Sequence, residues 1–128
     1  MTEQKDPKIV MSIDLKKDRL RIHRYTLKLL GDPEFVQLLI SPAQEAIIIQ
    51  GRSERETGGQ EIPVTFDRPG PRGTFEIYSR ELVSRIFRHF PGLDREGLTR
   101  LAGLYMEEEA CVWFPVSTQH PAEEDDDI

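Results

Sequence analysis

Apolar and polar residues alternate along the first part of the chain, as is typical of β-strands. Residues 9–22 read IVMSIDLKKDRLRI, and the polar cluster at residues 16–18 divides this stretch in two. A period of two residues places successive side chains on opposite faces of a strand. The pattern therefore predicts two short strands joined as a hairpin.

Two segments carry the signals of α-helices. Residues 23–30 (HRYTLKLL) lose the alternation and stop before Gly31, and a glycine followed closely by a proline commonly ends a helix. Residues 80–90 (RELVSRIFRHF) follow Ser79, a natural N-cap because its hydroxyl can accept a hydrogen bond from a free backbone N–H. Apolar residues recur there with helical spacing, at Leu82, Val83, Ile86, Phe87 and Phe90. We expect one helix of about two turns and one longer amphipathic helix.

The other apolar runs are predicted strands separated by polar turns. They are residues 35–40, 45–50, 62–66, 74–78, 98–106 and 110–116. The first two and the last two of these runs are predicted to form hairpins, since only a short polar turn separates them. Pro63 restricts its strand to a sheet edge or a strand start, because proline has no backbone N–H to donate.

The same order of elements occurs twice along the chain. LRIHRYTL (residues 20–27) aligns without a gap with FEIYSREL (residues 75–82), and each copy continues through a helix and a hairpin. We interpret residues 1–117 as a single domain built of two β-α-β-β repeats, residues 9–51 and 61–117. The predicted fold class is α+β, with one largely antiparallel sheet system and two helices on one face.

Acidic residues dominate the composition, but unevenly. The chain has 17 basic and 23 acidic residues and a net charge of -6, and five of the acids form a run at residues 123–127. Such a run repels itself, so we expect residues 118–128 to form a disordered acidic tail. No apolar run approaches the roughly 20 residues that span a bilayer. The sequence therefore predicts a soluble, cytoplasmic protein with no membrane partner.

Basic residues gather on the two predicted helices, which hold only one acid, Glu81. The basic residues are Arg24, Lys28, Arg80, Arg85 and Arg88. Residues three or four apart share a helix face, which aligns Arg24 with Lys28 and Arg85 with Arg88. A basic stripe on an otherwise acidic protein is the pattern that a phosphate backbone would require. The sequence therefore predicts that these five side chains contact double-stranded DNA without sequence specificity.

The duplicated β-α-β-β order with basic helices resembles one domain of the DNA sliding clamps, over residues 9–116. The resemblance implies helices that touch DNA through its phosphates and a role in tethering rather than in chemistry. It also implies that several copies of the chain would have to assemble to close a ring. We accordingly expect a homo-oligomer, and edge strands that pair between chains offer the route to a dimer.

A second, local resemblance concerns RLRIHRYTLKLLG (residues 19–31) and the hairpin that follows it. This segment is similar to the AbrB-type swapped-hairpin regulators, with His23 at the position that commonly holds proline in that pattern. The resemblance implies a dimeric DNA-binding barrel and a transcriptional regulator.

Enzyme chemistry lacks sequence support. The histidines are His23, His89 and His120, and their spacing fits no metal motif. Nucleophile-elbow, P-loop and dinucleotide signatures are absent from the sequence. Cys111 alternates with Trp113 in a predicted strand and is interpreted as a packing residue. We expect a non-enzymatic protein without a cofactor or a metal.

Three functions are consistent with these patterns. The first is a clamp-like, DNA-associated scaffold, indicated by the basic helices. The second is a protein-interaction or assembly module without a nucleic-acid role, favoured by the net negative charge. The third is the AbrB-type regulator.

Overall fold

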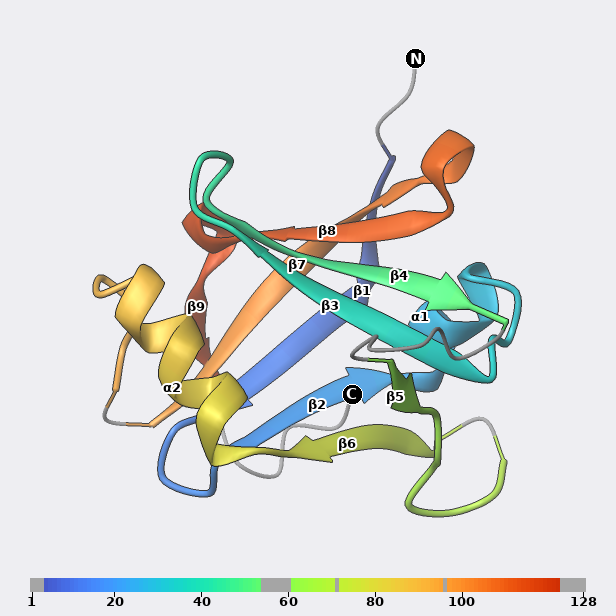
Figure 1. The fold of residues 1–128 in the computed structure, drawn as a ribbon, viewed down its shortest axis with the longest axis horizontal. Coiled ribbons are helices and arrows are strands. Elements are labelled where there is room, and N and C mark those ends of the chain that lie inside the picture. Colours follow the sequence, from blue (N-terminus) through green and yellow to red (C-terminus); the bar gives the residue numbers. More distant parts are fainter. Residues whose placement is uncertain (1–3, 54–60, 71, 96, 123–128) are drawn as a thin grey trace.

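The chain folds into one curled antiparallel sheet that forms a half-barrel (Figure 1). The computed structural model describes residues 4–53, 61–70, 72–95 and 97–122. Its sheet has the strand order β5-β3-β4-β8-β7-β1-β2-β6, and β9 pairs with β7. The strands are β1 (Gln4–Asp14), β2 (Arg19–His23), β3 (Phe35–Ser41), β4 (Ala46–Arg52), β5 (Ile62–Pro63), β6 (Thr74–Tyr78), β7 (Leu98–Met106), β8 (Cys111–Pro115) and β9 (His120–Ala122).

Side-chain alternation along the strands builds the core inside the curl. Met11 and Ile13 of β1 pair in register with Ile22 and Leu20 of β2, and all four side chains are buried. Because the sheet bends back on itself, its inward positions pack against the opposite wall rather than against a second layer. The core is therefore made mostly of strand residues.

Two short helices connect strands of the half-barrel. α1 (Arg24–Leu29) follows β2 directly and ends two residues before Gly31, whose φ of 87° is the left-handed conformation that glycine adopts without strain. α2 (Arg80–His89) starts at Ser79, whose hydroxyl accepts a hydrogen bond from the Leu82 backbone N–H at 3.1 Å. Both predicted helices and the predicted N-cap are thereby confirmed.

The predicted α+β class with two helices on one face is wrong. α1 and α2 lie at opposite ends of the half-barrel (Figure 1), and the structure is closer to an all-β fold. The physical reason is length, because a six-residue helix is only about 9 Å long and cannot cover a sheet as a layer. The sheet buries its own apolar face by curling instead.

The two halves of the chain have matching positions in the sheet. β2-α1-β3-β4 and β6-α2-β7-β8 run in the same order. β2 pairs with its counterpart β6, and β4 pairs with its counterpart β8. The ladder between β1 and β2 has no counterpart between β5 and β6 among the described residues, so the half-barrel is open there. Whether the halves arose by duplication stays a prediction.

The remaining sequence predictions concern hairpins and the tail. The hairpin predicted over residues 35–50 is confirmed as β3 with β4, and the one predicted over residues 98–116 is confirmed as β7 with β8. A 3-10 turn at Glu107–Glu109 joins β7 to β8. The segment predicted as a tail includes β9, while residues 123–128 lie outside the described residues. In the part of the chain that is described, neither helix has the length and apolar character to span a membrane.

Candidate functional site

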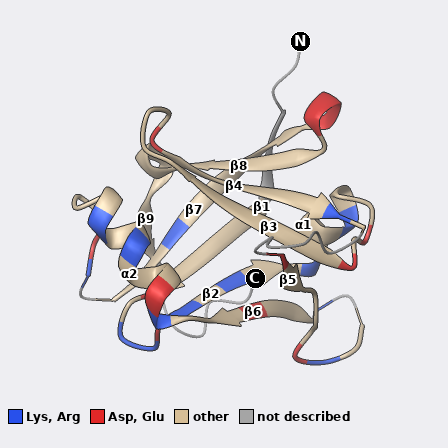
Figure 2. Ribbon diagram, viewed as in Figure 1, with Lys and Arg blue, Asp and Glu red and all other residues tan. Residues whose placement is uncertain are grey.

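The five predicted basic residues do not share one surface. Figure 2 shows Lys and Arg on α1, on α2 and on strands β2 and β7 between them. At one end of the half-barrel, the guanidinium of Arg24 lies 4.2 Å from the centroid of the Phe66 ring, and Lys28 is exposed. Arg24 therefore contributes to packing at α1 through a cation–π contact.

The basic residues of α2 have different surroundings. Arg80 is exposed and lies 3.9 Å from Asp18 Oδ2, Arg85 is half-buried beside a pocket, and Arg88 is exposed. With α1 at the other end of the molecule, the structure does not bring the five side chains together. Contact between these residues and DNA stays a prediction.

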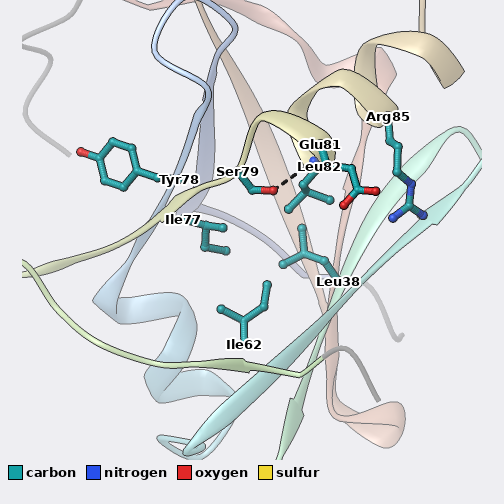
Figure 3. Close-up of a pocket in the computed structure, with 8 residues that line it drawn as sticks. All are labelled: Leu38, Ile62, Ile77, Tyr78, Ser79, Glu81, Leu82 and Arg85. Carbon is teal, nitrogen blue, oxygen red and sulfur yellow. Dashed lines mark hydrogen bonds between the residues drawn. The ribbon is translucent and has the colours of Figure 1, made fainter. Parts of the chain in front are cut away.

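A pocket of about 470 Å³ lies where the half-barrel is open. We call it the seam pocket, because strands from the two ends of the sheet order line it together with α2 (Figure 3). Its lining residues are Leu38, Ile62, Ile77, Tyr78, Ser79, Glu81, Leu82 and Arg85. Of these, only Arg85 belongs to the set predicted from the sequence.

Strand geometry explains the apolar part of the seam pocket. β5 pairs with β3 only at Phe35 and Val36. Leu38 lies further along β3, where β5 no longer pairs with it, and its side chain points into the curl. Leu82 reaches the same space from the first turns of α2, which Ser79 fixes by capping the helix. Apolar side chains from β3, β5, β6 and α2 thus meet without filling the space between them.

Polar groups lie along one side of the seam pocket. Glu81 and Arg85 are four residues apart on α2, and Figure 3 shows both side chains extending from the helix on the same side. Tyr78 is 64% exposed, its ring points away from the apolar side chains in Figure 3, and its hydroxyl donates to Glu76 Oε1 at 2.9 Å. The seam pocket therefore has an apolar floor, made by Leu38, Ile62 and Leu82, and carries the Glu81 carboxylate and the Arg85 guanidinium at its rim.

The loop before β6 is held to the first residue of that strand by two hydrogen bonds. The Thr74 backbone N–H donates to Asp67 Oδ1 at 2.8 Å, and the Asp67 N–H donates to the Thr74 carbonyl at 3.0 Å. The hydrogen bond from the Thr74 backbone is the largest of the causes that hold the pKa of Asp67 below its ordinary value. This pair is the point at which the chain between β5 and β6 is tied to β6.

Two further findings concern groups that could ligate a metal or act as a nucleophile. No three His, Cys, Asp or Glu side chains gather as a metal site within the described ranges. Cys111 is buried, and that burial raises the pKa of its thiol, which keeps it in the poorly nucleophilic protonated form. The sequence signal for the seam pocket was weak, because each of its apolar residues reads as ordinary core of a strand or helix.

Comparisons with protein-family models, with curated proteins and with solved structures each found no match. The pocket and the groups around it are therefore the grounds for a functional proposal.

Proposed function

We propose that this chain is a protein-interaction module that binds an extended segment of a partner protein at the seam pocket. The observation that carries the proposal is the position of the pocket at the open side of the half-barrel. Strands β3 and β5 form one side of the pocket, and β6 and α2 form the other. An extended segment fits such a place because it can add a strand to a sheet edge and insert alternate side chains into a pocket.

β6 provides the sheet edge for this mode of binding. Its only strand neighbour in the described sheet is β2, so its other side is a free edge along most of its length. Ile77 of β6 is buried and lines the pocket, which places a hydrogen-bonding edge beside an apolar cavity. A free edge invites pairing with another chain unless something covers it.

The apolar floor sets the chemistry of the partner. Leu38, Ile62 and Leu82 are half-buried and pack against the core, so a bound side chain would complete their burial. Full burial of one Leu or Val side chain is worth about 1.5–3 kcal/mol. The partner segment should therefore carry apolar residues at alternate positions.

A displayed library of random twelve-residue peptides, selected against the intact protein, tests the proposal. We expect binders with apolar residues at alternate positions, and chemical shift changes in the backbone amides of β6 when a synthetic binder is titrated. Leu82→Arg should weaken binding by at least about tenfold, because it places a charge on the apolar floor.

Leu39→Lys is the matched control, since Leu39 follows Leu38 on β3 and its side chain points to the other face of the sheet. Its affinity for the selected peptides should equal that of the wild type. Selection of no binder, or shift changes confined to residues away from β6 and α2, contradicts the proposal even if Leu82→Arg fails to fold.

A further inference from the structure

One row of polar side chains crosses five strands on the outer face of the sheet. Ser12 of β1 pairs with Arg21 of β2 on one side and with Arg100 of β7 on the other. The row continues to Glu76 of β6, which pairs with Arg21, and to His120 of β9, which pairs with Arg100. Directly paired residues of antiparallel strands point to the same face. We call these five residues the outer polar row.

The centre of the outer polar row is a hydroxyl that is shielded from water. Met11, Ile13 and Leu101, which alternate with members of the row, are fully buried in the core, so Ser12 points to the opposite face. Ser12 is nevertheless only 4% exposed, and its hydroxyl has no hydrogen-bond partner among the described residues. Because a buried polar group normally has a partner, this hydroxyl indicates that a further group belongs beside it.

The two side chains that flank Ser12 are cationic (Figure 2). Arg21 Nε and Nη2 donate to Glu76 Oε2, which uses two of the five N–H groups of the guanidinium. Arg100 is half-buried on the other side of Ser12. A hydroxyl donor between two guanidinium groups, each about one strand spacing of 4.8 Å away, is a set of donors that suits a carboxylate.

The surface that continues from the outer polar row toward the β1–β2 turn is also basic. This surface comprises the row itself, the next outward residues of the same strands, and residues 15–18 of the turn. Its acids are Asp14, Glu76 and Asp18, and Asp18 lies 3.9 Å from Arg80, a base outside this surface. Five basic residues therefore exceed the acids in a protein of net charge -6, and such a surface attracts an anion. They are Lys16, Lys17, Arg19, Arg21 and Arg100.

We propose that the acidic C-terminal segment, residues 123–127, binds across the outer polar row and places its carboxylates against Arg21, Arg100 and the Ser12 hydroxyl. The segment lies outside the described residues, and its sequence, EEDDD, has five carboxylates in succession. It therefore carries the charge and the acceptor oxygens that the row lacks. This contact is separate from the seam pocket and does not depend on the function proposed for it.

The position at which β9 ends brings the segment close to the row. Ala122, the last residue of β9, pairs with Leu98 of β7, and Leu98 pairs with Asp14 of β1, which is followed in the sheet by β2. Three strand spacings of about 4.8 Å, or about 14 Å, thus separate Ala122 from β2. Five extended residues cover about 17 Å. The segment is therefore long enough to reach both arginines of the row without any rearrangement of the sheet.

Paramagnetic NMR of the full chain locates the segment. Ile128→Cys provides a thiol for a nitroxide label directly after the acidic run, while Cys111 is buried and reacts poorly. The wild type treated with the same reagent controls for labelling at Cys111. We expect the strongest broadening at the backbone amides of Ser12, Arg21 and Arg100. The turn at Glu107–Glu109, at the other end of β7, should be little affected.

Charge dependence shows whether the row holds the segment. Arg100→Gln in the labelled chain should reduce the broadening by at least about half, because it removes a charge-assisted donor. Arg88→Gln is the matched control, since it removes the same charge from an exposed position on α2 and should leave the broadening unchanged. Salt at about 1 M, where the Debye length is about 3 Å, should also reduce the broadening. The salt measurement keeps the test valid even if Arg100→Gln fails to fold.

Two results overturn the proposal. One is broadening that is spread evenly over the surface, or that changes neither in high salt nor in Arg100→Gln. The other is a row whose amide signals move when inorganic phosphate is added while the label causes no broadening there, which would show that a free anion and not the C-terminal segment occupies it.

Discussion

Arg21 and Glu76 face each other at the middle of the ladder between β2 and β6, and Arg21 Nε and Nη2 donate to the same carboxylate oxygen, Oε2, at 3.0 and 2.8 Å. These residues are also equivalent in the alignment of the two halves of the chain. A local twofold axis between β2 and β6 would pair each strand with the other in antiparallel fashion, with the equivalent residues Arg21 and Glu76 opposite each other at the centre. Leu20 accordingly pairs with Ile77, and Ile22 pairs with Phe75.

The Arg21–Glu76 pair should contribute measurably to stability. Both side chains are mostly shielded from water, at 22% and 16% exposure. A double-mutant cycle with Arg21→Ala and Glu76→Ala, followed by urea unfolding, should give a coupling free energy of about 1 kcal/mol. Glu76→Ala should cost more than Arg21→Ala, because Arg19 Nη1 also lies 3.8 Å from Glu76 Oε2. Additive single effects would show that the pair contributes nothing.

Gly103→Ala should destabilise the fold by about 3 kcal/mol. A Cβ at residue 103 would collide with Ile9 Cγ2 and lie 2.9 Å from Phe114 Cε1, inside the curl where two walls of the sheet meet. Overpacking of a closely packed core costs about 1–3 kcal/mol, and here the obstacle is not a flexible chain end. Gly97→Ala is the control, because a Cβ there meets nothing within 4 Å, and its unfolding midpoint should match the wild type. Equal stability of the two variants would refute the packing argument.

Asp67 should titrate below the ordinary range of an aspartate. Because its folded pKa is lowered, the carboxylate stabilises the fold at neutral pH. That contribution is lost as the pH falls through the lowered pKa. Carbon NMR of the Asp67 side chain should show the low midpoint, and the Thr74 amide signal should shift with the same midpoint because it donates to Asp67.

The control for this titration is Asp67→Asn, in which the Thr74 amide should lose its acid transition. The stability difference between wild type and variant should shrink in acid. A Thr74 amide that moves with some other midpoint would mean that the hydrogen bond to Asp67 does not form.

Binding to long duplex DNA separates the interaction module from the clamp-like scaffold. With the basic residues of α1 and α2 at opposite ends of the molecule, we expect no binding at about 50 mM salt in a fluorescence anisotropy titration. The clamp-like scaffold requires sequence-tolerant binding whose salt slope falls by about one for each phosphate contact removed. If Arg85→Ala and Arg88→Ala flatten such a slope, the contacts with DNA are real.

Local patterns were sufficient to predict both helices and most of the strands, although β9 lies in the segment predicted as a tail. The alternation in residues 9–22 gave the β1–β2 hairpin, the Ser79 hydroxyl began α2, and α1 ended two residues before Gly31, because each depends on neighbours within a few residues. The alignment of LRIHRYTL with FEIYSREL likewise pointed to strands that the structure pairs directly. These features follow from side-chain periodicity and backbone capping alone.

Tertiary structure alone decided how the apolar faces were covered. Periodicity shows that Ile47 and Phe114 share an apolar face, but it does not show whether a helix or the opposite wall of the sheet packs on that face. In the structure the sheet curls on itself, α1 and α2 lie at opposite ends of it, and the half-barrel is open beside β6. Leu38 and Leu82 line the same pocket because the curl of the sheet brings β3 and α2 together, and no local sequence pattern encodes that long-range contact.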